Sequence, residues 1–599
     1  MKQKTGRLRL PWLWTGLCLL VGGLTIQAQQ NFTISGNVTD KVNGETLFGT
    51  SIFLKGTTIG AITNEYGFYS LTAPAGDYTL VFSHMGYKEI SIPIQLNQNL
   101  KMDMEIEEFS TQLDEVEVTA EEPERAILRK PEMSVSKLNI KTVKQMPVVL
   151  GEVDVIKSLQ ILPGVTNNGE GSSGFHVRGG AVDQNLVLLD EAIIYNTSHM
   201  LGFFSVFNAD AVKDLKLYKG GIPAKFGGRV SSVLDVRQKD GNSKNFALTG
   251  GIGAISSRLA AEGPMFNDRG SFLVAGRGSY AHLFLKLAGE QNSVSFYDLN
   301  LKTNYNLSEN DKLFLSGYFG RDIFEFGGSF SSSYGNASGN LRWNHIFNDR
   351  LFSNLSLIYS KYDYELSIDD FSFDWISSIK NYNAKYDLKY YFSDAFKLDF
   401  GVSTLKYEFD PGQIKPKGPD SAINELQLEQ KRALESAAYV NAEHKLTDRL
   451  TAQYGVRFSY FNRMGGQKLS LYANDQPLVY NNTLHIYQRT DPTDEVSFGK
   501  GESIKTFSNL EPRASLAYQL NDYSSVKLGY SRSAQYIHLL SNTSSVTPLD
   551  VWTPSGKYIK PQLSDQYALG YFRNFKDKIY SLEAEVYYKT VDNRIDYID

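Results

Sequence analysis

Cysteine, long apolar runs and basic clusters are scarce in this chain of 599 residues. Its one cysteine, Cys18, lies near the N-terminus, so the rest of the chain can form neither a disulfide nor a thiolate metal site. Beyond that region no stretch reaches the roughly 18 apolar residues that a membrane helix needs. With a formal net charge of -5 and no sustained basic run, the chain also lacks the electrostatic pattern of a nucleic-acid-binding protein.

Motifs of hydrolytic and metal-dependent catalysis are missing as well. No HExxH or G-x-S-x-G sequence occurs. The stretch SSGFHVRGGAVDQNLVLLDEAIIYN (172–196) does gather His176, Arg178, Asp183 and Asp190, a combination typical of an active site. However, Asp190 follows four apolar residues, as at a strand end, and His176 and Arg178 are predicted to face the same side of one strand. A buried arginine in a polar domain usually serves hydrogen bonding and packing, so we predict neither catalysis nor a cofactor or metal.

The first 28 residues predict a secretory signal peptide. A basic start precedes the apolar run LPWLWTGLCLLVGGLTI (10–26), and the small Ala28 offers a cleavage site. A transmembrane anchor is the alternative, but the apolar run is short and polar sequence follows it at once. If the mature protein lies in a membrane, it must do so as a closed β-barrel.

Residues 30–108 predict a small β-sandwich. Short β-branched and aromatic runs are separated by turn signals such as Asn43-Gly44 and Tyr66-Gly67, which gives about seven strands. Through SGNVTD, LKGTTIGAITNEYGFYSL and FSHMGY the segment resembles the carboxypeptidase-regulatory-like domain, a transthyretin- or immunoglobulin-like sandwich. The segment contains no catalytic cluster, so we expect a spacer or docking module.

Residues 109–135 form a linker that is first acidic and then basic. Within it, LDEVEVTA (113–120) alternates apolar and polar residues, so it could add as a strand to the sheet edge of another protein. The alternative is a last sandwich strand followed by a solvated tail.

Residues 136–240 predict a compact α+β unit that is rich in glycine. A helix is expected over 150–165, with Glu152 and Asp154 in its first turn and Pro163-Gly164 at its end. The motifs HVRGGAVDQNLVLLDEAIIYN, VKDLKLYKGG and AKFGGRVSSVLDV follow in order, and through them this unit resembles the plug domain of TonB-dependent outer-membrane receptors.

That resemblance implies roles for two groups of residues. The linker lies where this family carries its TonB box, which implies that the periplasmic C-terminal domain of TonB contacts Leu113, Asp114, Glu115, Val116, Glu117, Val118 and Thr119. A structural role within the plug is predicted for Arg178, Gly179, Gly180, Asp190, Gly227, Gly228 and Arg229. We expect the two arginines to be satisfied by carboxylates or backbone carbonyls, and the glycines to allow tight turns or close approach to neighbouring chain.

Residues 245–599 predict an antiparallel transmembrane β-barrel. In LTAQYGVRFSY (450–460), Leu, Ala, Tyr, Val, Phe and Tyr alternate with Thr, Gln, Gly, Arg and Ser. Such strands of about ten residues, apolar outside and polar inside, are typical of membrane barrels. A soluble sandwich with its apolar face inward is the alternative that alternation alone leaves open.

Turn signals set the rhythm of the strands. Seven of them, from Asn267-Asp268 to Lys576-Asp577, separate about fifteen strands, and the long connections near 408–432, 461–507 and 536–562 are expected on the outer side. The resemblance implies about 22 strands, and bacterial barrels have even strand numbers. We therefore expect the chain to stop before its barrel is complete, which would leave the strand near 246–254 without a closing partner.

Taken together, the resemblance implies uptake of a scarce solute across the outer membrane of a Gram-negative bacterium, with the N-terminal domain in the periplasm. The solute classes of the family are iron chelates, cobalamin, peptides and oligosaccharides. The partners are TonB, outer-membrane lipid and a small solute, and a surface lipoprotein partner is left open. The sandwich followed by plug and barrel is the arrangement of Bacteroidetes receptors, but LLDEAIIYN differs from the DG-type turn expected of their glycan importers. A ligand-sensing signal transducer and a surface adhesin or structural barrel remain the alternatives.

Overall fold

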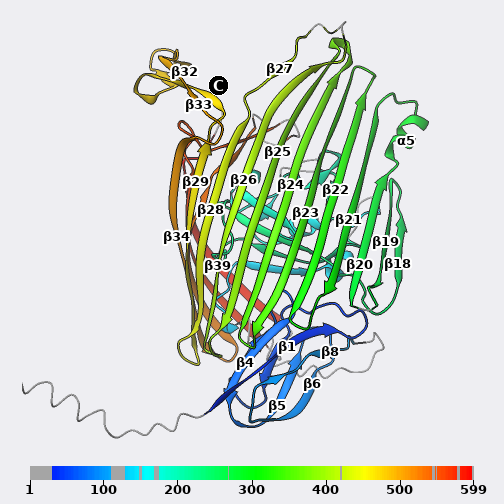
Figure 1. Ribbon diagram of the computed structural model, residues 1–599, viewed down its shortest axis with the longest axis vertical. Coiled ribbons are helices and arrows are strands. Elements are labelled where there is room, and N and C mark those ends of the chain that lie inside the picture. Colours follow the sequence, from blue (N-terminus) through cyan, green and yellow to red (C-terminus); the bar gives the residue numbers. More distant parts are fainter. Residues whose placement is uncertain are drawn as a thin grey trace, which may run out of the picture.

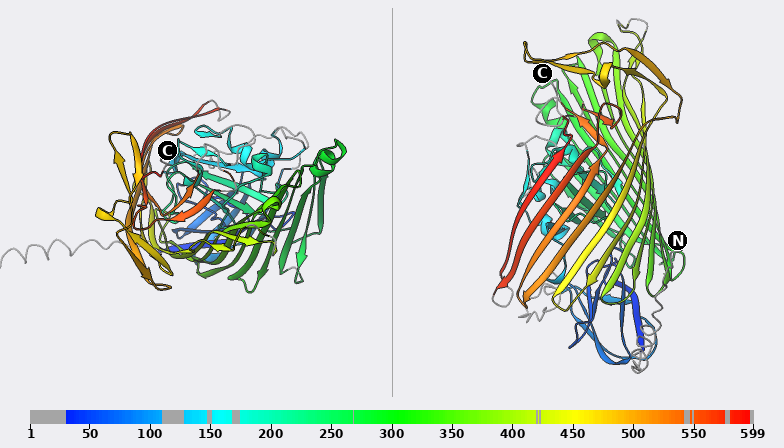
Figure 2. Two further views of the ribbon diagram at one scale, coloured as in Figure 1. Left: turned by 90° about the horizontal axis from the view of Figure 1, so that it is seen from above. Right: turned by 90° about the vertical axis from the view of Figure 1, so that its left-hand side faces the viewer.

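The structure is a computed structural model that describes residues 30–109, 128–146, 151–167, 174–267, 269–418, 421, 423–541, 547, 550–575 and 580–595, and most of these residues lie in β-strands. A small sandwich lies at one end of a tall curved sheet, and a third domain lies inside that sheet (Figure 1). Seen from above, the curved sheet wraps around this inner domain (Figure 2, left). The expected order of sandwich, plug and barrel is present.

The N-terminal sandwich has eight strands rather than about seven, because the chain after β6 forms two short strands that pair in parallel with β1. One sheet joins β4, β1, β7 and β8, and the other has the order β3-β2-β5-β6. Their facing sides bury an apolar core that includes Ile34, Ile52, Leu80 and Phe82. The strands are β1 (Asn31–Asp40), β2 (Ser51–Leu54), β3 (Gly60–Ile62), β4 (Phe68–Pro74), β5 (Gly76–Ser83), β6 (Ile90–Leu96), β7 (Leu100–Lys101) and β8 (Met104–Ile106).

The plug is built on a five-stranded sheet in the order β13-β12-β17-β16-β9, with short helices and strand pairs around it. Apolar residues of its strands and helices, among them Val155, Leu217 and Leu234, share one core. Its elements are β9 (Val135–Asn139), α3 (Ile140–Lys144), α4 (Val155–Leu159), β10 (Val165–Thr166), β11 (His176–Val177), η1 (Val182–Gln184), β12 (Asn185–Leu189), β13 (Ala192–Ile193), β14 (Ser198–His199), η2 (Met200–Gly202), β15 (Phe204–Ser205), β16 (Val212–Tyr218) and β17 (Ser232–Gln238).

Two local predictions for the plug are wrong. The helix expected over 150–165 is only α4, because Asp154 caps its start by accepting from the Lys157 backbone N–H at 2.8 Å, which leaves Glu152 outside the helix. The side chains of His176 and Arg178 do not share a strand face, since β11 ends at Val177 and Arg178 turns the chain with a φ of 49°. Asp190 does follow a buried strand, β12, as expected.

The barrel sheet has fifteen strands in one antiparallel path, as counted from the sequence, and β27 pairs with β26 beside that path. Within the described residues β18 and β39 are its two edges, so the expected gap lies between them. The path consists of β18 (Ala247–Ile252), β19 (Ser256–Met265), β20 (Gly270–Ser279), β21 (Ser293–Asn306), β22 (Asp311–Phe326), β23 (Phe330–Asn348), β24 (Leu351–Ile368), β25 (Phe373–Tyr391), β26 (Phe396–Pro416), β28 (Lys431–Lys445), β29 (Leu450–Met464), β34 (Ser503–Asn521), β35 (Ser524–Gln535), β38 (Gln562–Phe575) and β39 (Tyr580–Asp592).

Alternation along the strands separates an inner from an outer surface, as predicted. On β29, Arg457 and Ser459 are buried against the interior, whereas Phe458 is 48% exposed on the outside. The outward side chains are mostly apolar or aromatic, and the inward ones carry most of the charge. This arrangement is typical of a barrel wall that faces lipid.

The short turns that lie within the described residues are found at the end of the sheet that holds the sandwich, which we call the short-turn end. The β23–β24 and β25–β26 turns, with Asp349 and Asp394, contact the sandwich there. The long connections lie at the opposite end and contain α5 (Ala281–Leu287), η3 (Asp369–Phe371), β27 (Leu426–Gln427), β30 (Gln467–Leu471), η4 (Ala473–Asp475), β31 (Leu478–Asn481), β32 (Ile486–Arg489), β33 (Asp494–Phe498), β36 (Ile537–Leu540) and β37 (Val551–Pro554). Among the described residues no helix is long and apolar enough to cross a lipid bilayer.

Candidate functional site between plug, barrel wall and sandwich

Buried ion pairs fasten the plug to one side of the barrel wall. Arg277 of β20 lies 2.7 Å from the Asp298 carboxylate of β21 and 3.5 Å from Glu152 of the plug. His199 of the plug lies 2.7 Å from Asp322 of β22 through Nδ1. Because all five side chains are almost fully buried, removing one partner would leave an uncompensated charge, at a cost of about 3–5 kcal/mol.

Asp190, predicted to be a structural plug residue, lies in a second buried network. The Lys302 ammonium of β21 lies 3.1 Å from Asp190 and 3.0 Å from Asp240. The Gln238 backbone N–H donates to the Asp190 carboxylate, and the Asn340 side-chain amide donates to its carbonyl at 2.6 Å. Asp190 thus links the end of a plug strand to two strands of the wall.

Arg178 and Arg229 bond to protein groups. The Arg178 guanidinium donates to Glu585 of β39 at 2.7 Å and to the Ser134 hydroxyl at 2.9 Å, and it lies 4.4 Å from the centre of the Tyr587 ring. The Arg229 guanidinium donates to the backbone carbonyl of its neighbour Gly228 at 2.8 Å. Arg178 therefore ties the plug to the edge strand of the wall.

The four predicted glycines divide into two kinds. Gly179 and Gly228 have φ angles of 73° and 80°, in the left-handed region that favours glycine. Gly180 and Gly227 allow close approach instead. A Cβ on Gly180 would lie 2.1 Å from the Ser231 hydroxyl, and one on Gly227 would lie 2.3 Å from Nε of Arg457 on β29.

One segment through which the sandwich docks on the short-turn end is the loop at residues 64–68, which sequence analysis identified only as a turn. Phe68 stacks on Phe352 of β24 with ring centres 5.7 Å apart and meets Tyr391 of β25 edge-on at 5.9 Å. Tyr66 donates from its hydroxyl to the plug carboxylate of Glu191 at 3.1 Å. The two aromatic residues that flank Gly67 in NEYGF are the sequence signal for this contact. Their role in docking becomes clear only from their partners in the plug and the wall.

Glu65 adds a charged contact between the same loop and the plug. Its carboxylate pairs with the Lys225 ammonium and lies 3.6 Å from the Arg237 guanidinium. Burial acts to raise the pKa of Glu65, but the two cations outweigh it and hold this pKa well below its ordinary value. The carboxylate is therefore ionised at neutral pH, and the contact weakens only when the pH falls through that depressed pKa.

Replacing Phe68 with alanine should release the sandwich from the barrel without unfolding it. The ring is buried against the wall and not in the sandwich core, so the roughly 3–5 kcal/mol that a buried Phe-to-Ala change costs falls on docking. Hydrogen exchange of residues 57–68 should rise in the intact receptor. Met85→Ala is the matched control, since Met85 is 84% exposed. Unchanged hydrogen exchange in Phe68→Ala would show that Phe68 does not hold the sandwich against the barrel.

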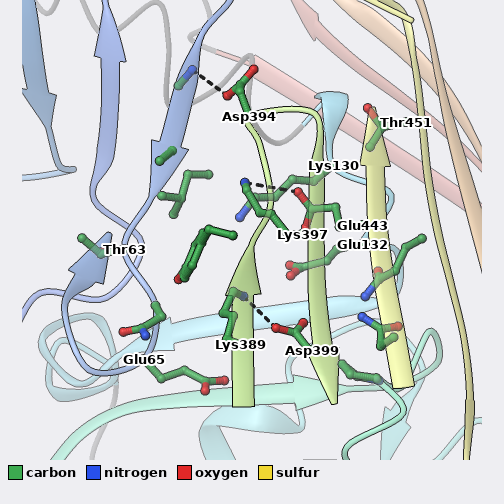
Figure 3. A pocket seen from close by; sticks show the side chains of 18 of the residues that line it. Thr63, Glu65, Lys130, Glu132, Lys389, Asp394, Lys397, Asp399, Glu443 and Thr451 are labelled. Atoms are coloured by element: carbon green, nitrogen blue, oxygen red, sulfur yellow. Dashed lines mark hydrogen bonds and ion pairs between the residues drawn. The ribbon is translucent and has the colours of Figure 1, made fainter. Parts of the chain in front are cut away.

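A cavity of about 310 Å³ lies where sandwich, plug and wall meet (Figure 3). Thr63 and Glu65 reach it from the sandwich, Lys130 and Glu132 from the chain that leads into the plug, and Thr451 from β29. Burial lowers the pKa of Lys130 to about 8. No group of three or more His, Cys, Asp or Glu side chains that could hold a metal ion occurs in the described part of the chain.

The predicted TonB-contact residues, Leu113 to Thr119, lie outside the described residues. The described chain on either side of them ends at the short-turn end. Phe109 closes the sandwich by bonding to the Gly86 carbonyl, and Arg129 donates to Gln519 near the β34–β35 turn at 3.2 Å.

Comparisons with known proteins match the three domains in chain order. Residues 34–118 match the CarboxypepD_reg-like domain, residues 130–232 the TonB-dependent receptor plug domain, and residues 279–599 the TonB-dependent receptor-like β-barrel. The first of these matches runs through most of 113–119, so the contact of that segment with TonB stays a prediction.

A curated relative is the TonB-dependent receptor SusC of Bacteroides thetaiotaomicron, which is 28% identical over 261 residues. The match covers 39% of this chain and 24% of SusC, so the chain spans about a quarter of that relative.

Solved structures show the same fold at low identity. The hemophore receptor HasR of Serratia marcescens, in complex with HasA and heme, has a TM-score of 0.55 at 14% identity over 78% of this chain and 74% of its own. The siderophore receptor PirA of Acinetobacter baumannii has a TM-score of 0.54 at 15% identity, and the match covers 80% of this chain and 73% of PirA. The copper transporter OprC has a TM-score of 0.55 at 12% identity, and the match covers 78% of this chain and 72% of OprC.

The family assignment follows from the extent of these matches. The barrel match alone covers more than half of the chain, and the plug and sandwich matches precede it in the order that the structure shows. The matched plug and barrel are domains of TonB-dependent receptors, a family of receptors and transporters and not of enzymes. The chain belongs to the TonB-dependent receptors of the outer membrane.

Proposed function

We propose that this receptor takes up a scarce solute across the outer membrane, driven by TonB. The observation that carries the proposal is how the plug is held: it lies inside the curved barrel sheet, and ion pairs and hydrogen bonds fasten it to the wall. Polar contacts can be exchanged for contacts with water when the plug moves, whereas separating two apolar surfaces exposes them to water at a cost that nothing repays. A plug of this kind can close the barrel at rest and separate from the wall when TonB pulls on it.

TonB is proposed to act on residues 113–119. The described chain on both sides of this segment ends at the short-turn end, which is the periplasmic end of the receptor. The segment is therefore within reach of a periplasmic protein. Its alternating sequence suits an added strand, in which backbone hydrogen bonds supply the affinity and alternate side chains the specificity. The chain continues from this segment into β9, and Glu132 just before β9 lies 3.4 Å from Lys137 of that strand, so a pull on the segment acts on the plug.

Solute binding outside can reach the plug through the connection 536–562, because described residues of this connection contact the plug. Gln535, at the start of this connection, donates to the Asp183 carboxylate of the plug at 3.1 Å, and the Leu539 backbone N–H donates to the same carboxylate at 3.3 Å. Further along, the ring of Trp552 lies 5.3 Å from the Arg229 guanidinium. A solute that displaces this connection therefore changes contacts of the plug itself.

The solute is proposed to be an iron chelate, a cobalamin, a peptide or an oligosaccharide. HasR is a hemophore receptor whose structure contains HasA and heme, PirA is a siderophore receptor, and OprC is a copper transporter. Their low identity to this chain shows only a shared fold, whereas SusC is 28% identical over 261 residues. Growth of a deletion strain on single limiting nutrients separates the four classes.

The growth experiment also separates uptake from the alternatives. Loss of growth on one nutrient, restored by the wild-type gene, is the expected result. A signal transducer would instead lose gene induction while the nutrient still enters, and an adhesin would lose surface attachment only. Normal growth of the deletion strain on every limiting nutrient would contradict the proposed function.

A further inference from the structure

The plug contacts the wall differently on its two sides. On the β20–β23 side, Arg277, Lys302 and Arg342 of the wall each bind a plug carboxylate. On the side of β25, β26 and β28, Lys385 also lies 3.7 Å from the plug carboxylate of Glu191, but two ion pairs at the short-turn end join wall residues to each other. Lys389 lies 3.3 Å from Asp399, and Lys397 lies 3.6 Å from Glu443 (Figure 3).

The cavity of about 310 Å³ occupies this second side. Because a water molecule takes about 30 Å³ of liquid, the cavity has room for about ten waters or a small polar solute. Basic and acidic side chains line it in equal number, seven of each, so neither sign of solute charge is favoured. The space is suited to a hydrated, hydrogen-bonding solute.

The sandwich closes the periplasmic side of this cavity. Its segment 57–66 supplies one wall, and the Gly60 backbone N–H donates to Asp394 at the β25–β26 turn at 3.1 Å. Two further polar contacts join the sandwich to the wall nearby. The Ser35 hydroxyl donates to Asp349 at 2.9 Å, and the Arg350 guanidinium donates to Thr33 at 2.9 Å.

We infer that this cavity is the compartment through which the solute leaves the barrel, and that the sandwich is its cap. The solute passes the short-turn ends of β25, β26, β28 and β29, beside the Lys389–Asp399 and Lys397–Glu443 pairs within the wall, and not along β20–β23. The cap must leave its dock before the solute reaches the periplasm. Residues 113–119 follow the sandwich directly in the chain, so the same pull acts on cap and plug. This inference rests on the proposed uptake function.

A first experiment narrows the cavity from the barrel side. Thr451→Trp adds a large ring to the lining, and Thr451→Val keeps the size of the residue. We expect uptake to fall at least tenfold in Thr451→Trp, with surface binding of the solute unchanged, and to stay near wild type in Thr451→Val. Wild-type uptake in a normally assembled Thr451→Trp receptor would overturn the assigned path.

A second experiment holds the cap shut. A Cβ on Gly44 of the sandwich would lie 3.3 Å from Cβ of Ser243, close to the span of about 3.5–4.5 Å that a disulfide needs. Ser243 lies between β17 and β18, so a Gly44→Cys/Ser243→Cys bond ties the sandwich to the base of the barrel and leaves the plug strands unattached. Cys18 is the only natural cysteine, which leaves no competing thiol in the folded domains.

In the oxidised double variant we expect uptake to be lost, and reduction should restore it. The single variant Ser243→Cys should behave like wild type under both conditions. Full uptake with the cross-link formed would overturn the role of the sandwich as a cap. Failure of the proposed function is recognised separately, because the wild-type receptor would then show no uptake that depends on the proton-motive force.

Discussion

Replacing Val116 with proline should abolish uptake and leave solute binding at the cell surface intact. Proline removes one backbone N–H and fixes φ, so the segment 113–120 can no longer complete the hydrogen bonds of a strand added to TonB. Val116 is far from the outer loops in the chain, so the solute site is not altered. Uptake and surface binding of the same labelled solute are measured in parallel.

Val116→Ala is the matched control for this change. It removes most of the side chain but keeps the backbone donor, and we expect it to retain at least half of the wild-type uptake rate. If Val116→Pro transports normally, the segment is not the TonB contact, and the alternative of a last sandwich strand with a solvated tail is favoured.

Arg178→Ala should make the outer membrane leak. The guanidinium joins the plug to Glu585 of β39 and to Ser134 at the entrance of β9, and it is almost fully buried. Removing it leaves the Glu585 carboxylate without its cationic partner, with only the Ser134 backbone N–H and hydroxyl donating to it, which costs up to about 3–5 kcal/mol and loosens the plug. Sensitivity to large antibiotics that the closed barrel excludes should rise at least several-fold.

Two variants separate loss of the ion pair from loss of fold. Arg178→Lys keeps a positive charge beside Glu585 and should leak less than Arg178→Ala. Because the two residues act as one pair, the double variant Arg178→Ala/Glu585→Gln should leak no more than Arg178→Ala alone. A solute found bound directly to Arg178, or an unchanged antibiotic barrier, would contradict its structural role.

Much of the barrel could be predicted from the sequence because its determinants are local. Side chains alternate with a period of two along a strand, so a stretch such as 450–460 predicts both faces without knowledge of its neighbours. Each short turn, such as those at Asn310-Asp311 and Asn348-Asp349, is also formed by residues that are neighbours in the chain. The short turns that the structure describes fall at one end of the sheet. Strand count and barrel topology follow from these two patterns.

The site could not be predicted in the same way because its contacts join residues far apart in the chain. Tyr66 and Glu191 are separated by 125 residues, and Arg178 and Glu585 by 407. The helix predicted over 150–165 is too long for the same reason, because a contact with a distant residue decides where it starts. Glu152 is a good residue for a first helical turn, but in the folded chain its carboxylate pairs with Arg277 of the wall instead.

The most direct measurement of the central claim is accumulation of the identified solute by intact cells before and after the proton-motive force is collapsed. If the receptor is an energy-coupled transporter, accumulation stops when the proton-motive force is lost, while the solute bound at the surface stays constant. The same cells with the receptor gene deleted should show neither binding nor accumulation. Accumulation that continues at the same rate without the proton-motive force would contradict the account.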